Sequence, residues 1–166
     1  MVALLLMSDL HHVRVNEAWM KLSFWVVLLG AFSASAVAQS TPVGLWKTID
    51  DRTGHDKSQI RIVEDHGVLV GKVEKLLDPD TKPGAICDLC TDDRKDKPVL
   101  GMTVIRNVKR SEKDPAVWDG GDILDPKNGN VYRVRMTPLE SGKKLEVRGY
   151  IGAPVFGRTQ TWVRIE

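Results

Sequence analysis

The chain has 166 residues and a formal net charge of +2, from 24 basic and 22 acidic side chains. The two signs of charge are interspersed, and no group of lysines and arginines lies beside aromatic residues. This pattern argues against nucleic acid as the main partner. The length supports one domain with one hydrophobic core.

The segment 20–38 has the three parts of a secretory signal peptide. Met20 and Lys21 precede an apolar run over 22–32, and the small residues after it end in Ala-Val-Ala at 36–38. This pattern predicts cleavage before Gln39. An uncleaved anchor is the alternative, but the Ser/Ala-rich second half is weak for a membrane span.

Residues 1–19 contain acidic and histidine side chains, unlike the basic leader of a signal peptide. We therefore interpret 1–19 as an over-annotated extension and expect translation to begin at Met20. The mature chain, 39–166, is then an exported single domain with no membrane span.

The mature chain contains short alternating apolar runs and no long run with a helical period. Glycine and asparagine recur between the runs, where tight hairpins require a positive φ. Predicted turns are 51–54, 66–67, 125–129 and 141–142. The predicted strands are 43–49, 59–63, 68–77, 99–108, 117–124, 131–137, 144–151 and 159–165.

Eight short strands joined mainly by tight turns predict an all-β protein, a single antiparallel up-and-down β-barrel. Closure of such a sheet removes its exposed edges. An eight-stranded barrel has an interior that side chains fill or that holds one small ligand. Two connections are not tight turns: the long segment 78–98 and the shorter segment 111–115.

Cys87 and Cys90 form a C-x-x-C in the segment 78–98. In an exported protein the two favour a disulfide. A redox centre remains a second possibility, although no helix start is predicted there to stabilise a thiolate. A zinc site is a third, although the spacing of His55 and His66 fits no compact site.

The polar residues form no recognisable catalytic set. The mature chain has two histidines, both in predicted turns, and no G-x-S-x-G motif. A calcium loop is disfavoured because Lys82 stands where the third oxygen ligand belongs. We expect a non-enzymatic protein without cofactor or metal. The acidic residues that could surround a cation are Asp78, Asp80, Asp88, Asp92 and Asp93.

The mature chain contains the motifs GLWKT at 44–48, CDLC at 87–90 with KDKP at 95–98, LGM at 100–102, GGDILDP at 120–126, NGNVY at 128–132, RGYIG at 148–152 and GRTQTW at 157–162. Together these motifs resemble the bacterial exported family called domain of unknown function 2147. The resemblance implies a calycin-like barrel similar to lipocalins, usually in the periplasm of Gram-negative bacteria, and implies no established activity.

The G-x-W at 44–46 also looks like the motif that opens lipocalin barrels. That likeness implies that Trp46 closes one barrel end and that an arginine near the last strand stacks on its ring, a role we assign to Arg158. Trp162 is expected to contribute to the same closure. A guanidinium over an indole stabilises by about 0.5–2 kcal/mol.

The resemblance favours a barrel that binds a small apolar or amphipathic molecule, such as an envelope lipid. One alternative is a ligand-free barrel that acts through its surface on another envelope protein. Another is a thiol redox protein that uses Cys87 and Cys90. The pocket candidates, which are inward-capable residues of the middle strands, are Trp118, Tyr132, Val134, Met136 and Tyr150.

Overall fold

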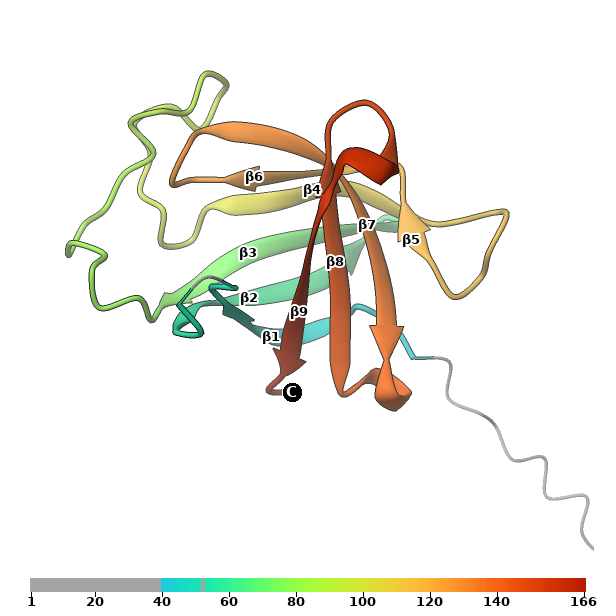
Figure 1. Cartoon of the computed structure of the whole chain (residues 1–166). Helices are drawn as coiled ribbons and strands as arrows, with labels where there is room; N and C mark the ends of the chain where they lie inside the picture. The colour runs from blue at the N-terminus through green and yellow to red at the C-terminus, as the bar shows by residue number, and fades with distance from the viewer. Residues whose placement is uncertain (1–39, 52) are drawn as a thin grey trace, which may run out of the picture. The chain divides into compact units, whose positions relative to one another are not determined.

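The computed structural model describes residues 40–51 and 53–166, which belong to one compact unit. The predicted signal peptide and the extension before it lie outside the described residues. Within the described ranges, nine strands form one antiparallel sheet (Figure 1). The strands are β1 (Gly44–Ile49), β2 (Asp56–Asp65), β3 (Val68–Leu76), β4 (Thr103–Arg110), β5 (Trp118–Asp119), β6 (Asp122–Asp125), β7 (Asn130–Leu139), β8 (Lys144–Tyr150) and β9 (Arg158–Arg164). Two 3-10 turns, η2 (Glu140–Gly142) and η3 (Pro154–Phe156), follow β7 and β8.

The sheet closes on itself. Its order is β3-β2-β1-β9-β8-β7-β5-β4-β6, and β3 also pairs with β4. Strands β5 and β6 are two parts of the one strand predicted at 117–124, because both pair with β4 and with β7. Counted as one, they give a closed eight-stranded antiparallel barrel, which confirms the predicted fold class.

The break between β5 and β6 falls at two glycines. Gly120 has a φ of +79°, and a Cβ on Gly121 would lie 2.2 Å from the carbonyl oxygen of Arg106. A larger residue at 121 would therefore push β4 away. The pair bends the strand where the barrel curves, as glycines in strands commonly do.

The structure has turns at the positions where the sequence predicts them. His66 and Gly67 have φ values of +50° and +79° and join β2 to β3, and Gly129 (φ +72°) precedes β7. The largest boundary difference is at β4, predicted from residue 99 but observed from Thr103. A turn closed by Met102 N–H donating to Val99 O occupies the residues before it.

Trp46 fills one end of the barrel, the closed end. Its side chain is buried, and its Nε1 donates to the carbonyl oxygen of Pro42 at 2.7 Å. The guanidinium of Arg164 lies over the indole, 4.2 Å from the ring centroid. The same guanidinium donates to Thr41 O at 2.7 Å and to Val43 O at 2.8 Å.

The prediction that Arg158 stacks on Trp46 was wrong. The register between the first and last strands explains the difference, because Trp46 on β1 is the Cα partner of Arg164 on β9. Arg158 begins β9, six residues earlier, and pairs there with Asp51 beyond the other end of β1.

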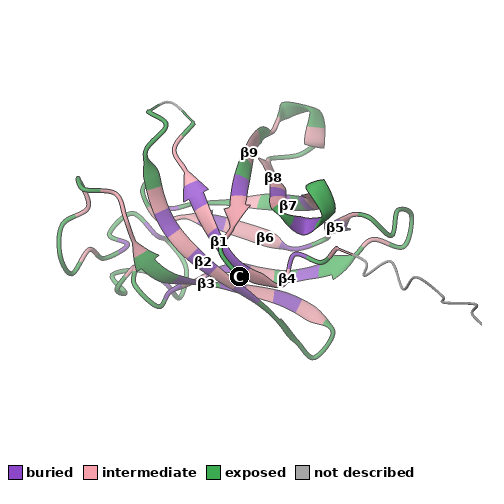
Figure 2. Ribbon diagram, turned by 90° about the horizontal axis from the view of Figure 1, so that it is seen from below, coloured by how far each residue is buried: buried purple, intermediate pink, exposed green. Residues whose placement is uncertain are grey.

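Apolar side chains fill the barrel from Trp46 to its middle. Buried residues alternate with more exposed ones along the longer strands, such as β2, β3 and β7, as the purple and pink bands of Figure 2 show. On β7, Val134 and Met136 are buried while Arg133 and Arg135 are exposed, as the alternation predicts. The other end of the barrel is hollow.

Candidate functional site

The hollow end contains a cavity of about 910 Å³ that opens to solvent. Its mouth lies between the segment 77–102 and the β8–β9 loop. The strand ends around it are those of β1, β3, β6 and β8, and the starts of β2, β7 and β9. The inner wall is mainly apolar, and its apolar residues include Ile60, Val73, Leu76, Val104, Ile123, Leu124, Val147 and Trp162.

A few polar groups interrupt this apolar wall. Thr48 and Ser58 are buried and share a hydroxyl–hydroxyl hydrogen bond of 2.9 Å. Gln160 accepts from Trp162 Nε1 at 3.1 Å, which orients the indole at the cavity floor. The wall is thus apolar with a small number of fixed polar groups, as in most small-molecule sites.

The mouth is lined by charged residues of both signs. Lys57 Nζ lies 3.7 Å from Asp125 Oδ1, and Arg158 Nε donates to Asp51 Oδ2 at 2.6 Å. The hydrogen bond from Arg158 lowers the pKa of the Asp51 carboxyl and so favours its charged form. The mouth therefore has a polar edge above the apolar wall.

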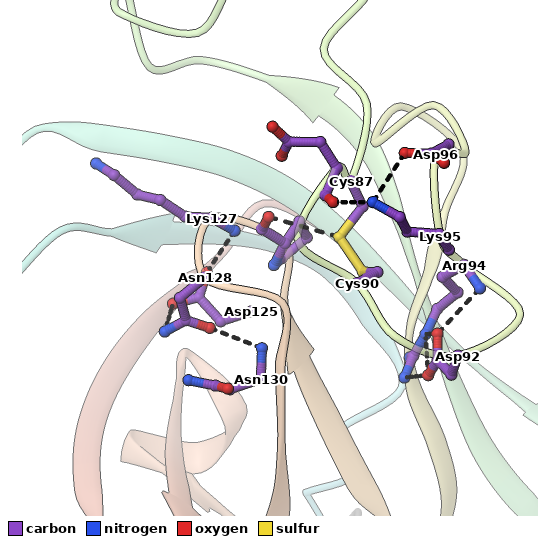
Figure 3. Close-up of a disulfide and its surroundings, with 12 residues drawn as sticks. Cys87, Cys90, Asp92, Arg94, Lys95, Asp96, Asp125, Lys127, Asn128 and Asn130 are labelled. Carbon is purple, nitrogen blue, oxygen red and sulfur yellow. Dashed lines mark hydrogen bonds and ion pairs between the residues drawn. A yellow bond between two sulfur atoms is a disulfide. The ribbon is translucent and has the colours of Figure 1, made fainter.

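The long segment over the mouth is held by Cys87 and Cys90, which the structure joins in a disulfide. Both cysteines are buried, and the sulfur of Cys87 contacts the carbonyl oxygen of Pro126 at 3.5 Å (Figure 3). A Cβ on Gly129 would lie 2.0 Å from the carbonyl oxygen of Leu89. The disulfide loop therefore packs backbone to backbone on the β6–β7 turn.

Ion pairs fix the same segment to β4. Arg94 is only 4% exposed; it forms a two-pronged pair with Asp92, and its Nη1 donates to Thr103 O at 3.2 Å. Hydrogen bonds from Arg94 lower the pKa of Asp92 to about 2. Arg106 on β4 holds Asp93 through two bonds of 2.8 and 2.9 Å. These contacts make one side of the mouth rigid.

Two of the five predicted pocket residues line the cavity. Tyr132 and Tyr150 lie at its wall near the mouth, and the hydroxyl of Tyr132 accepts from Asn128 Nδ2 at 3.2 Å. Val134 and Met136 face inward but do not line the cavity, because they belong to the filled part of the core.

The fifth predicted pocket residue, Trp118, lies away from the cavity. It borders a separate pocket of about 370 Å³ together with Leu69 and Val108. The guanidinium of Arg110 lies 5.4 Å from the centroid of its ring. Trp118 therefore packs toward the closed end, because β5 pairs with the later part of β7, at Met136.

Several lining residues were not predicted. Trp162, expected at the barrel closure, forms the cavity floor instead, and Gly149 leaves room in the wall. Alternation along β2 and β3 could have identified Ile60 and Val73 as inward residues. The lining from 78 to 88 carries no such signal, because that segment has no periodic pattern.

The acidic residues do not gather around a cation. Among residues 40–51 and 53–166, no cluster of three or more histidine, cysteine or acidic side chains has metal-binding geometry. Asp92 and Asp93 are instead engaged by arginines. The part of the chain that the structure describes also has no helix both long and apolar enough to cross a membrane.

One family model and one solved structure resemble this chain. No curated protein sequence matches the chain. A solved structure, described as protein HP1028 from the human pathogen Helicobacter pylori and as belonging to the lipocalin family, is similar in fold. Its TM-score is 0.65 at 19% sequence identity, over 76% of this chain and 84% of that one. Residues 44–164 match the model of a family described as "Uncharacterized protein conserved in bacteria (DUF2147)". The chain therefore belongs to this family.

Proposed function

We propose that the protein is a non-enzymatic carrier that binds one small amphipathic molecule inside the barrel. The apolar part of the ligand lies against Trp162 and the inner wall, and its polar group lies at the mouth. The observation that carries this proposal is the cavity of about 910 Å³ with an apolar wall at the open end of a closed barrel.

The size and lining of the cavity support a ligand of lipid-like chemistry. Small-molecule sites commonly have volumes of about 300–1,000 Å³ and bury most of the ligand against apolar side chains. Burial of apolar surface stabilises by roughly 25 cal/mol per Å². A chain of about ten methylenes in contact with Ile60, Val104 and Trp162 would therefore supply most of the affinity.

The charges at the mouth limit which polar group the ligand can carry. The lining contains four basic and four acidic side chains, so opposite charges balance around the opening. This balance favours a neutral or zwitterionic group over a strongly charged one. The eight residues are Lys57, Lys82, Lys127, Arg158, Asp78, Asp80, Asp88 and Asp125.

The sequence supports export and a place in the periplasm, where envelope lipids supply such ligands. A ligand-free interaction module would need no hollow interior, so the cavity favours ligand binding over this alternative. Because both cysteines are buried, a thiol redox role is less favoured than binding. Binding is therefore the function that the geometry favours.

A cavity-filling variant tests the proposal. Gly149 lines the cavity, and a Cβ there would meet the Tyr132 Cβ at 3.5 Å and the Ile123 Cγ2 at 3.7 Å, which are ordinary contacts. Gly149→Leu should therefore project into the cavity without moving the backbone. We expect at least about a tenfold loss of affinity for N-phenyl-1-naphthylamine, measured by its fluorescence, with folding retained.

The matched control is Thr161→Leu, an exposed position on neighbouring β9 that should leave the affinity unchanged. A single-chain zwitterionic lipid should displace the probe from the wild type, and native mass spectrometry of protein purified from its own periplasm should detect a bound molecule. Equal probe affinity in Gly149→Leu and Thr161→Leu would contradict binding in the barrel.

A further inference from the structure

The β8–β9 loop presents large apolar side chains to solvent. Ile151 is 68% exposed, Val155 74% and Phe156 81%, and Phe156 is the most exposed of the large hydrophobic side chains in the described ranges. In Figure 1 this loop is the red segment that contains η3 and connects β8 to β9. Exposed apolar side chains that cluster on one element mark an interaction site more often than scattered ones do.

The loop's own contacts hold these side chains outward. Arg148 on β8 donates from Nε to Pro154 O at 2.7 Å and from Nη2 to Val155 O at 3.3 Å. A Cβ on Gly157 would lie 2.7 Å from the carbonyl oxygen of Gly149, so the chain folds back tightly on β8. The exposure of Val155 and Phe156 is therefore a fixed property of the loop.

Two arginines flank the loop, whose residues 151–157 include no acidic side chain. Arg158 pairs with Asp51, so Arg148 supplies the positive charge beside the apolar side chains. The three hydrogen bonds of Arg148 go to neutral oxygens, those of Pro154, Val155 and Thr159. These contacts orient its guanidinium without cancelling its charge.

A second arginine adjoins Arg148. Arg135 on β7 is its Cα partner, and like charges directly opposite each other destabilise an antiparallel pair. Asp119 lies 3.8 Å from Arg135 and offsets part of the charge of that arginine. An anion beside Arg148 would relieve the rest of the repulsion.

We propose that the β8–β9 loop docks the barrel on an anionic lipid bilayer. Val155 and Phe156 enter the apolar part of the membrane interface, and Arg148 lies beside the phosphate groups. Apolar and basic side chains on one short element are what interfacial anchoring requires. Three apolar side chains on a loop tip are too few for a stable protein interface, which buries about 800 Å² on each partner.

The position of the loop connects this docking with the cavity. Ile151 and Phe156 line the cavity mouth as well as the outer surface. A docked loop would therefore place an apolar path between the bilayer and the cavity wall. Docking itself does not depend on a bound ligand, so the two proposals can fail separately.

Vesicle flotation tests the docking. The chain is expressed at full length, and the form that accumulates is used for wild type and variants alike, so that any N-terminal segment contributes equally. We expect the wild type to bind vesicles of phosphatidylethanolamine and phosphatidylglycerol and to bind phosphatidylcholine vesicles much less. Val155→Ser/Phe156→Ser should lower the partition coefficient at least about tenfold, through lost apolar burial.

A matched double variant controls for apolar loss in general. Val63→Ser/Ile165→Ser removes two exposed apolar side chains, 42% and 43% exposed, from the closed end and should bind vesicles like the wild type. Raising salt from about 50 to about 500 mM should weaken binding of the wild type.

Two further comparisons separate the two proposals. Gly149→Leu should keep vesicle binding while losing the fluorescent probe. Val155→Ser, at a residue outside the cavity lining, should weaken vesicle binding while keeping the probe. Equal partition of the two double variants, or equal binding to both kinds of vesicle, would overturn docking. The loss of a cross-linked protein partner from the loop variant, with vesicle binding unchanged, would overturn it in favour of a protein interface.

Discussion

The two ends of the barrel are formed by the same strands, but one end is filled with side chains and the other is hollow. At the closed end, Trp46 lies beneath the Arg164 guanidinium among other buried side chains. At the open end, Thr48, Ser58 and Gly149 occupy inward positions, and a cavity of about 910 Å³ remains. The interior thus has a filled half that stabilises the fold and a hollow half that we propose binds the ligand.

The segment around the disulfide extends this contrast. Loops at a binding mouth are commonly the mobile part of a structure. Here the segment 87–97 is held by a disulfide, by the buried Arg94 and by the Arg106–Asp93 pair. The mouth therefore has one rigid side, and rigidity there preserves the opening of the cavity.

Removal of the closed-end plug should have the largest effect on stability. Trp46→Ala deletes a fully buried indole and its hydrogen bond to Pro42, and we expect the free energy of unfolding to fall by about 3–5 kcal/mol. Urea denaturation measures the loss. Affinity for the fluorescent probe should be retained where the variant is folded, and a selective loss of probe binding at unchanged stability would contradict the division into two halves.

A smaller effect should follow from Asp92→Asn, which leaves the buried Arg94 without its carboxylate. We expect a loss of about 1–2 kcal/mol at pH 7. Because the folded-state pKa of Asp92 is about 2, below the ordinary 3.8, the charged carboxylate stabilises the fold above about pH 4. That contribution is lost as the pH falls toward 2, so the gap between wild type and variant should narrow.

Urea denaturation at pH 7 and at pH 3 measures this gap. The neighbouring Asp93→Asn is the control, because the Asp93 side chain is 69% exposed and its pair with Arg106 should contribute under about 1 kcal/mol. A gap for Asp92→Asn that widens on acidification would show that the carboxylate is not the stabilising form.

Removal of the disulfide should change the stability of the whole barrel least, and its effect should be confined to the segment around it. Cys87→Ala/Cys90→Ala opens a very short loop, for which the chain-entropy model gives at most about 2 kcal/mol. We expect faster amide hydrogen exchange over residues 87–97 and unchanged exchange at Trp46 and its neighbours. Faster exchange throughout the barrel would contradict the view that the disulfide acts only at the mouth.

Local sequence pattern predicted the strands and the turns because both depend on neighbouring residues. The pair His66-Gly67 identified a hairpin, and alternation on β7 separated Val134 and Met136 from the flanking arginines. The arginine over Trp46 could not be predicted in the same way. Arg158 and Arg164 lie an even number of positions apart on β9, and only the register with β1 selects Arg164.

The location of the cavity could not be predicted from the local sequence pattern either. Inward residues of similar chemistry occur along the whole barrel, and Val134 fills space while Val147 lines the cavity. Which of them face empty volume depends on the summed side-chain volume in each cross-section. The path of the segment 77–102, which supplies part of the lining, depends on a disulfide and ion pairs that have no periodic signature.

The pairing of the first strand with the last has a consequence for the order of folding. Trp46 meets Arg164 across 118 positions, and Leu45 N–H donates to Glu166 O at the C-terminus. Contacts at such separation require closure of the whole chain, and proteins rich in them fold in milliseconds to seconds. Until the final strand joins, β1 and β8 remain unpaired edges on which another chain could add. The pairing of β9 thus determines both when the barrel closes and how long the unpaired edges are exposed to misassembly.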